Sequence, residues 1–127
     1  METLHRETMI RNYLHAYNTF DVDGMVADFD NAIVFTNRSN GEITLKLEGL
    51  SAFKEQAKKA TSFFSERTQT VQSFHHAENH TEVGILYHGI LAADLPNGMK
   101  KGEALTLEGI SVFTFSGNKI VELTDIS

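Results

Sequence analysis

The first part of the chain carries apolar residues at helical spacing. An i, i+3, i+4, i+7 pattern is typical of a helix with one buried face, and it is formed here by Ile10, Tyr13, Leu14 and Tyr17. The pattern predicts a helix from about residue 3 to about residue 19. Asp21 is a suitable N-cap for a short second helix, whose inward-facing residues would be Met25, Val26 and Phe29.

Beyond residue 31 the pattern changes to that of a hairpin. Residues 32–37 are β-branched and aromatic, residues 38–41 have turn chemistry, and residues 42–47 alternate polar and apolar. A third helix is expected next, with Ser51 as its cap. Its apolar face would consist of Phe53, Ala57, Ala60 and Phe64.

The second half of the chain is predicted to form four long strands. They are expected at about 67–77, 81–94, 103–115 and 119–126. Short turns between long strands predict antiparallel neighbours. Glycines interrupt the strands and are expected at bulges or points of strong curvature, at Gly84, Gly89 and Gly109.

Helices followed by antiparallel strands predict an α+β fold, with helices packed on one face of one sheet. Residues 83–91 and 105–115 are apolar on both strand faces. One face can pack on the helices, and the other is most simply covered by a second copy of the chain. We therefore expect a homodimer through the outer sheet face. With no linker or repeat in the sequence, residues 1–127 are expected to form a single domain.

Composition narrows the possible functions. The chain has no cysteine, which excludes zinc fingers, iron–sulfur clusters and thiol catalysis. Its 11 basic and 17 acidic residues give a net charge of −6, which disfavours a nucleic-acid partner. The first residues are charged where a signal peptide needs an apolar stretch, and the nearly apolar run at 83–93 is too short to span a bilayer. We therefore expect a cytoplasmic protein without a membrane partner.

Five short segments occur in an order and spacing typical of one superfamily. They are YLHAY at 13–17, FDVDGMV at 20–26, DNAIV at 30–34, EGL at 48–50, and GNKIVE at 117–122 with Asp125 after it. With them the chain resembles the nuclear-transport-factor-2-like superfamily, in particular its SnoaL-like and ketosteroid-isomerase-like branches. The resemblance implies a curved antiparallel sheet, shaped as a cone, wrapped around the three helices of the N-terminal half. It also implies an apolar pocket at the open end and, usually, a homodimer.

The fold alone does not give the activity, because this superfamily hosts isomerases, cyclases, dehydratases and binding modules. In ketosteroid isomerase a carboxylate moves a proton, while a tyrosine and a protonated aspartic acid stabilise the enolate oxygen. The resemblance places Tyr13 at the tyrosine, Thr36 at the base and Ser111 near the second donor. Because threonine is no general base near neutral pH, steroid-isomerase chemistry of that type is not expected.

The SnoaL-like cyclases suggest a different acid/base. They resemble this chain in having an aspartate on the last strand, facing the pocket, and Asp125 matches that region. If its strand face looks into the cone, burial would raise the pKa of Asp125 toward the range useful for proton transfer. Tyr13 would then donate to a carbonyl oxygen. The alternatives are a core tyrosine bonded to the backbone and a solvated aspartate at a strand end.

Further pocket residues depend on the strand register. Tyr87 and His88 must face opposite ways, so one register places Tyr87 in the pocket and a slip by one places His88 there as a proton-transfer partner. The expected inner lining is aromatic and apolar and consists of Tyr17, Phe29, Phe53, Phe64, Phe113, Phe115 and Leu123. Some of these residues, at the cone mouth, would bind a small hydrophobic molecule.

A cluster of potential metal ligands lies at His75, His76, Glu78 and His80. Adjacent strand residues point to opposite faces, so the first two histidines cannot both face one ion. We interpret these residues as polar side chains of a hairpin that face the solvent, and we expect no metal site.

Two functions remain open. The first is an enzyme without a cofactor, which isomerises, cyclises or dehydrates a hydrophobic carbonyl compound by proton transfer through Tyr13, Asp125 and, in one register, His88. The second is a non-catalytic dimeric binding or accessory domain with a vestigial pocket, which the residues at 36 and 111 favour. Polar groups converging in an open cavity would favour the first; a cavity filled by Phe and Leu would favour the second.

Overall fold

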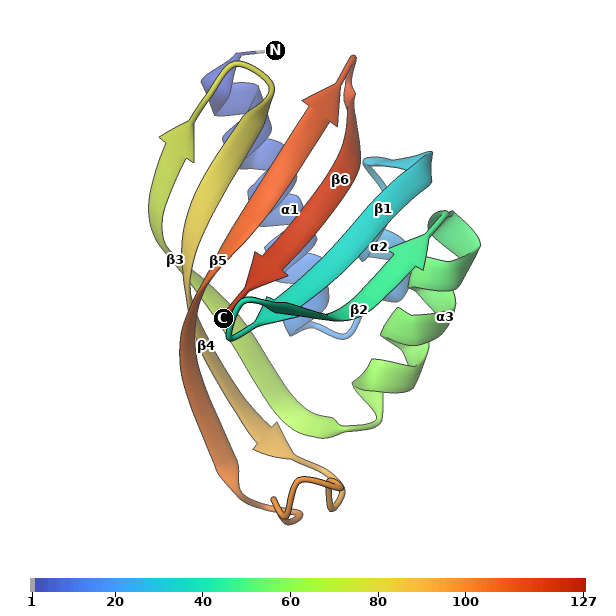
Figure 1. The fold of residues 1–127 in the computed structure, drawn as a ribbon, viewed down its shortest axis with the longest axis vertical. Helices are drawn as coiled ribbons and strands as arrows, with labels where there is room; N and C mark the ends of the chain where they lie inside the picture. The colour runs from blue at the N-terminus through green and yellow to red at the C-terminus, as the bar shows by residue number, and fades with distance from the viewer. Residues whose placement is uncertain (1) are drawn as a thin grey trace.

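The computed structural model describes residues 2–127 as three helices and six strands (Figure 1). In chain order they are α1 (Thr3–Asn18), α2 (Val22–Met25), β1 (Phe29–Ser39), β2 (Glu42–Glu48), α3 (Leu50–Thr61), β3 (Phe64–His76), β4 (His80–Leu91), β5 (Ala104–Ser116) and β6 (Lys119–Ile126). The predicted α+β fold class is confirmed.

All six strands form one strongly curved sheet in the order β2-β1-β6-β5-β4-β3. Neighbours are antiparallel except β1 and β6, which run parallel. The expectation of antiparallel neighbours holds wherever a short turn joins two strands. The expectation does not apply to β1 and β6, which are separated in the chain by 79 residues. No tight turn joins these two strands, so none forces them to run antiparallel. This parallel pair attaches the β1–β2 hairpin to the rest of the sheet.

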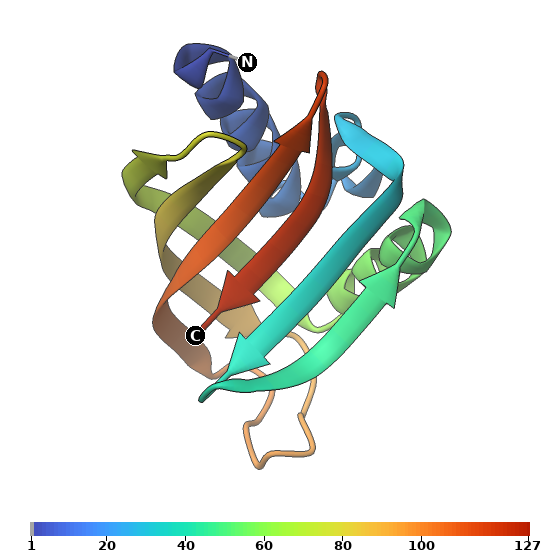
Figure 2. The same ribbon diagram turned by 45° about the horizontal axis from the view of Figure 1, so that its top comes forward.

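The helices cover the inner, concave face of the sheet, and α1 and α3 lie on that same side (Figure 2). The core between α1 and the sheet is made by side chains with almost no exposed surface, among them Ile10, Ile33, Val83, Phe113 and Leu123. None of the helices in residues 2–127 covers the outer face. Two of its large apolar side chains, Ile110 and Ile126, are 45% and 39% exposed.

The third helix begins two residues earlier than predicted and ends before Phe64. Its N-cap is Gly49, with a φ of 93°, and Ser51 lies inside the helix. The Gly49 N–H donates to the Ile33 carbonyl at 2.8 Å, which fixes the turn out of β2. Phe64 pairs with Leu91 and opens β3, so it is not part of the apolar face of the helix.

The glycines of the long strands play different parts. The β3–β4 register shifts between Val71 and Ser73, beside Gly84, which confirms an irregularity there. No register shift occurs along β4–β5 in the described pairing, so the expected bulge at Gly109 is absent. Gly109 instead allows a close approach, because a Cβ there would lie 2.8 Å from the carbonyl oxygen of Ile126.

None of the helices in residues 2–127 has the length and the apolar run that a bilayer crossing requires.

Candidate functional site

Two adjoining cavities have volumes of about 270 and 350 Å³ and are lined mainly by inward-facing residues, although Ile110 and Ile126 of the outer face also border the first. We call them the first and the second cavity. The first is bordered by β3, β4, β5 and the end of β6, and the second by α1, α3, β1 and β2. Both are lined by Tyr17, Asn37 and Asp125, so these three residues mark where the cavities meet.

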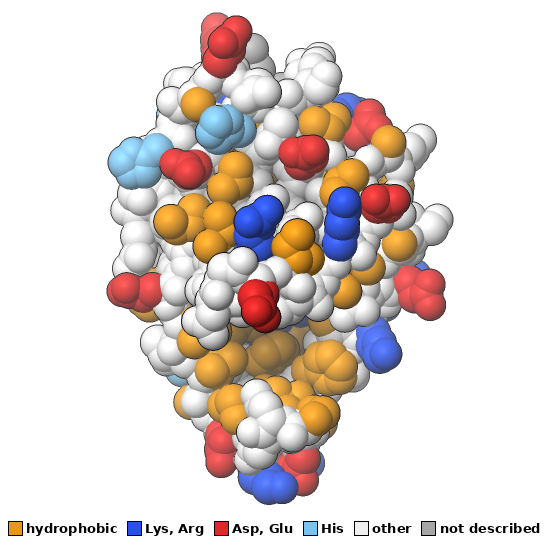
Figure 3. Space-filling view, in the orientation of Figure 1, with side chains coloured by type: hydrophobic (Ala, Val, Ile, Leu, Met, Phe, Trp, Pro, Cys, Tyr) orange, Lys and Arg blue, Asp and Glu red, His pale blue; other side chains and the backbone are white. Residues whose placement is uncertain are grey.

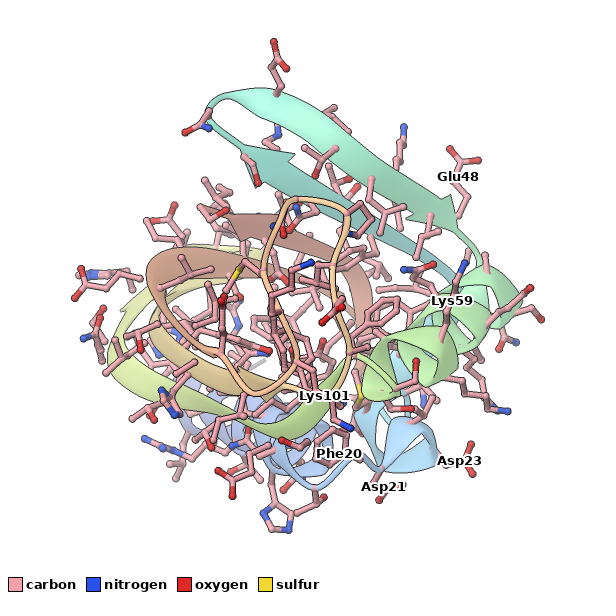
Figure 4. The ribbon with its side chains drawn as sticks, turned by 90° about the horizontal axis from the view of Figure 1, so that it is seen from below. Phe20, Asp21, Asp23, Glu48, Lys59 and Lys101 are labelled. Atoms are coloured by element: carbon pink, nitrogen blue, oxygen red, sulfur yellow. The ribbon has the colours of Figure 1, made fainter. Side chains whose placement is uncertain are left out.

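The first cavity exists because β5 is longer than β6. Ile110 pairs with Ile126, the last residue of β6, and residues 104–109 of β5 have no partner on that side. A gap is therefore left between the lower half of β5 and the β1–β2 hairpin. Figure 3, drawn in the orientation of Figure 1, shows a hollow with hydrophobic sides in the lower half of the molecule. Seen from below, β3, β4 and β5 curl around the interior, with the connection that carries Lys101 in front and α3, marked by Lys59, beside it (Figure 4).

Asp125 lies on β6 between two polar neighbours. Asn37 of β1 pairs with it on one side and Ser111 of β5 on the other. The Ser111 hydroxyl donates to Asp125 Oδ1 at 2.7 Å. Burial raises the pKa of the Asp125 carboxyl to about 6, and the Ser111 hydrogen bond opposes that shift only in part. A carboxyl with this pKa is populated in both protonation states near neutral pH.

Tyr13 is a buried residue of α1 that lines the second cavity. Its ring stacks on Phe29 at 5.6 Å between centroids and meets the edge of Phe113. Burial raises the pKa of the Tyr13 phenol well above its usual value, and the nearby Asp125 charge adds to the shift. The phenol therefore keeps its proton and can act as a hydrogen-bond donor.

Tyr17 and Tyr87 form a second phenolic group, with their hydroxyl oxygens 3.1 Å apart. Tyr17 lines both cavities and Tyr87 lines the first. Burial is the main reason that the pKa of each phenol is raised. Three protonated phenols thus lie along the two cavities, while Asp125 is the group that titrates near neutral pH.

Arg67 is a lining residue that sequence reasoning did not single out. It lies on β3, lines the second cavity and is only 3% exposed. Its Nε donates to the Tyr17 carbonyl at 2.9 Å, and its guanidinium carbon lies 3.8 Å from the centre of the Tyr17 ring. The available signal was alternation, because Arg67 shares an inward face with Gln69 and Val71, which are also sheltered.

The structure brings seven of the predicted site and lining residues to the cavities: Tyr13, Tyr17, Phe53, Phe64, Tyr87, Ser111 and Asp125. Three others, Phe29, Phe113 and Leu123, are fully packed in the core and line neither cavity. Their side chains point into the interior, as expected, but they lie in the packed core and not at a cavity wall where a ligand could touch them. Phe29 and Phe113 instead pack against the ring of Tyr13.

Two predicted residues face the other way. His88 is exposed on the outer face, where its Nδ1 lies 3.3 Å from Thr106 Oγ1. The register that places Tyr87 inward is the one observed, so His88 cannot assist at the cavity. Thr36 lines neither cavity, because alternation along β1 turns Phe35 and Asn37 inward instead. Asn37, the residue after Thr36, pairs with Asp125 instead, and its Nδ2 donates to Thr44 Oγ1.

The histidines of the β3–β4 hairpin make separate contacts. His76 Nε2 lies 2.9 Å from Glu7 Oε2 and its Nδ1 lies 2.9 Å from Thr81 Oγ1, which ties α1 to the hairpin. His75 is exposed. Within residues 2–127, no three metal-ligating side chains gather at one point.

A curved sheet around helices, with a half-buried carboxyl in an interior cavity, defines the class of cone-shaped pocket proteins with the nuclear-transport-factor-2-like fold. The chain belongs to the SnoaL-like domain family, whose model matches residues 10–123. No curated protein matches the chain in sequence.

Similar solved structures support the fold. A protein from Jannaschia sp. CCS1, provisionally named a SnoaL-like polyketide cyclase, is 10% identical with a TM-score of 0.81, over 96% of this chain and 84% of that one. TerC, crystallised with polyporic acid, is 14% identical with a TM-score of 0.77, over 96% and 90%. A protein with a ketosteroid-isomerase-like fold from Catenulispora acidiphila DSM 44928, in complex with trimethylamine, is 11% identical with a TM-score of 0.76, over 92% and 82%.

Proposed function

We propose that the chain catalyses proton transfer on a small hydrophobic carbonyl compound, without a cofactor. The observation that carries the proposal is the place of Asp125: a half-buried carboxyl with a pKa of about 6, at the point where two largely apolar cavities meet. A general acid/base works best when its pKa lies near the working pH. Two of the similar structures hold small molecules, which supports a ligand in the cavity.

The reaction uses the ionised carboxylate first. Asp125 removes a proton from the carbon next to the carbonyl group, and the electron pair of that C–H bond moves to form an enolate. Tyr13 donates a hydrogen bond to the oxygen on which the negative charge develops. In a β,γ-unsaturated ketone the negative charge extends over the neighbouring double bond, so Asp125 can return the proton to the γ-carbon, which shifts the double bond and completes an isomerisation. In a cyclisation, the enolate carbon attacks a second carbonyl group, and the new alkoxide takes the proton from the Asp125 carboxyl.

The polar lining favours this function over a vestigial pocket. Asp125, Ser111 and Asn37 converge at the junction of the cavities, and the aromatic residues Phe29 and Phe113 pack beside the cavities without filling them. A binding domain without chemistry has no need of a desolvated carboxyl there, since burial disfavours its charged form in spite of the Ser111 hydrogen bond.

The test uses 2-tetralone, a hydrophobic ketone with acidic protons next to its carbonyl group. In D₂O at pH 7, the protein is expected to speed the exchange of these protons for deuterium, followed by NMR. Asp125→Asn should abolish the acceleration, whereas Asp23→Asn, at an exposed carboxylate of α2, should leave it unchanged. Exchange that is equally fast with Asp125→Asn would contradict the role of this carboxyl; binding of the ketone without any exchange would favour the non-catalytic alternative.

We also propose that two copies associate through the outer sheet face. Ile110 and Ile126 are paired neighbours on β5 and β6, and both are substantially exposed. Half-buried Leu86, Ile90 and Val112 extend this apolar surface over β4 and β5. Exposed apolar side chains on an uncovered sheet face are typical of a self-complementary interface, and Glu108, which pairs with Leu86 on the same face, adds a polar group to it.

A further inference from the structure

We propose that the second cavity takes a hydrophobic ligand that carries a carboxylate, and that the guanidinium of Arg67 pairs with this carboxylate. The inference names the ligand class of the site described above and rests on the proposed function only in that the same cavity holds the substrate. Nothing in the proton-transfer step itself requires a negative charge on the substrate, so the two proposals can fail separately.

The first observation is that Arg67 is buried and incompletely bonded. Only 3% of its surface is exposed. Its Nε donates to the Tyr17 carbonyl, but Nη2 is shielded from water and has no hydrogen-bond partner within residues 2–127. An arginine carries five N–H donors, and buried donors are almost always satisfied. A partner is therefore missing at this guanidinium.

The second observation is that no carboxylate of the described chain neutralises Arg67. The ion pairs in residues 2–127 lie elsewhere and join Lys46 to Glu48, Lys54 to Asp23, His76 to Glu7 and Lys100 to Asp94. Asp125 lines the same cavity but bonds to Ser111 and forms no ion pair with Arg67. A buried charge without a counter-charge is strongly destabilising, so an anion that enters the cavity gains a large part of this lost interaction.

Aromatic rings hold the guanidinium in place. Its central carbon lies 3.8 Å from the centre of the Tyr17 ring and 4.6 Å from that of Phe20. These cation–π contacts stabilise the charge in part and fix the plane of the group. A planar, fixed guanidinium suits a carboxylate, and because Nε is bonded to the Tyr17 carbonyl, the contact with the ligand falls on the Nη groups of this lining residue.

The rest of the second cavity suits an apolar body. Its volume is about 350 Å³, and its apolar lining includes Met25, Phe35, Leu45, Leu47 and Phe53. A free inorganic anion would leave this surface unfilled, whereas an aromatic or alicyclic carboxylate covers it. Asp125 lines the same cavity, so a molecule anchored by its carboxylate at Arg67 places its other groups within the space that Asp125 borders.

Arg67 also has a structural contact, since its bond to the Tyr17 carbonyl holds the last turn of α1. If Arg67 were purely structural, its substitution would lower the stability of the protein and weaken the binding of charged and uncharged ligands alike. An anion-binding arginine affects the difference in affinity between a charged ligand and its uncharged analogue. The test therefore measures this difference.

The experiment compares 2-naphthoate with 2-naphthamide, which have nearly the same shape but differ in charge. Dissociation constants are measured by calorimetry at pH 7.5 for the chain of residues 1–127. We expect wild type to bind the carboxylate roughly tenfold or more tightly than the amide. Arg67→Met should remove this preference while amide binding stays, and Arg67→Lys should keep part of it. Lys54→Met, which removes a positive charge of α3 outside the cavities, should leave the preference unchanged.

Equal affinities in wild type, binding of neither compound, or a preference that persists in Arg67→Met would each overturn the inference. If Arg67→Met does not fold, the wild-type preference and its reduction in Arg67→Lys decide the matter. The two proposals are told apart by Asp125→Asn, which should lose ketone exchange and keep the preference for naphthoate. Naphthoate binding without ketone exchange in wild type would overturn proton transfer alone, and ketone exchange without the preference would overturn the anion site alone.

Discussion

Two opposing influences act on the carboxyl group of Asp125. Burial disfavours the charged form and raises the pKa, while the hydrogen bond from Ser111 favours the charged form and lowers it. Burial is the larger effect, which gives a pKa of about 6 in place of 3.8. The hydroxyl of Ser111 therefore has a functional consequence, because it sets how far the pKa rises.

Removal of that hydroxyl should raise the pKa of Asp125 further. In Ser111→Ala the carboxylate loses a charge-stabilising donor, so we expect a pKa above 6 by carboxyl ¹³C NMR titration. Thr106→Ala is the matched control, since it removes a hydroxyl from the outer face of the same strand. An unchanged or lower pKa in Ser111→Ala would mean that the hydrogen bond has little effect in solution.

The raised pKa also predicts how stability changes with pH. Between about pH 4 and pH 6 the folded chain holds a proton on Asp125 that the unfolded chain has released, so the free energy of unfolding falls as pH rises through this range. The shift from 3.8 to about 6 corresponds to up to about 3 kcal/mol at pH 7 to 8. Asp125→Asn should be more stable than wild type there, with the difference vanishing below about pH 4. Urea unfolding at several pH values measures it, and a difference that does not depend on pH would contradict the prediction.

Sequence reasoning located the residues of the site better than it located their directions. Tyr13, Ser111 and Asp125 reach the cavities as the family resemblance implied. Thr36 and His88 do not, because a shift of one residue along a strand reverses the face and the sequence alone does not fix the register. Arg67 was not predicted, because alternation with Gln69 and Val71 was the only sign of its inward face and arginine is seldom buried.

At the scale of elements, the position of the Asp125 carboxyl depends on how the end of β6 packs against β5. Gly109 faces the carbonyl of Ile126, the residue after Asp125, and a Cβ there would lie 2.8 Å from that oxygen. The backbone of β6 cannot move away without disturbing its pairing with β5. The position of the carboxyl therefore depends on a glycine in the neighbouring strand.

Gly109→Ala should consequently lower the free energy of unfolding by about 1–3 kcal/mol and weaken ketone exchange. Gly84→Ala is a suitable comparison, because the nearest atom to its new Cβ is the hydroxyl of Ser73, which can rotate away. Urea unfolding of both variants measures the difference. A smaller loss for Gly109→Ala than for Gly84→Ala would show that the contact with Ile126 is easily relaxed.

The order and type of the helices and strands were predictable, whereas the start of α3 and the pairing of β1 with β6 were not. The helical spacing of the first segment gave α1 to within a residue at each end, since one face of this helix is continuously apolar. The start of α3 at Leu50 depends on the positive φ of Gly49, and the parallel pairing of β1 with β6 depends on the whole sheet. Local patterns carry neither kind of information.

At the scale of the whole molecule, the uncovered outer face predicts self-association. The chain mass is 14.2 kDa, so we expect light scattering to give about 28 kDa at micromolar concentration. Ile110→Glu should shift the protein toward monomer, because the charge would be buried in the apolar interface. Ser65→Glu, at an exposed position on β3 away from β5 and β6, should leave the mass unchanged. A wild-type monomer would contradict the proposed interface.

The most direct test of the catalytic account is the pH dependence of 2-tetralone exchange, corrected for the reaction without protein. Because the ionised carboxylate removes the proton, the rate should rise as pH increases, with a midpoint near 6, and level off above it. The same profile in Asp125→Asn should stay at the background at every pH. A wild-type rate without a midpoint near 6, or a profile that Asp125→Asn retains, would contradict the claim that this carboxyl performs the chemistry.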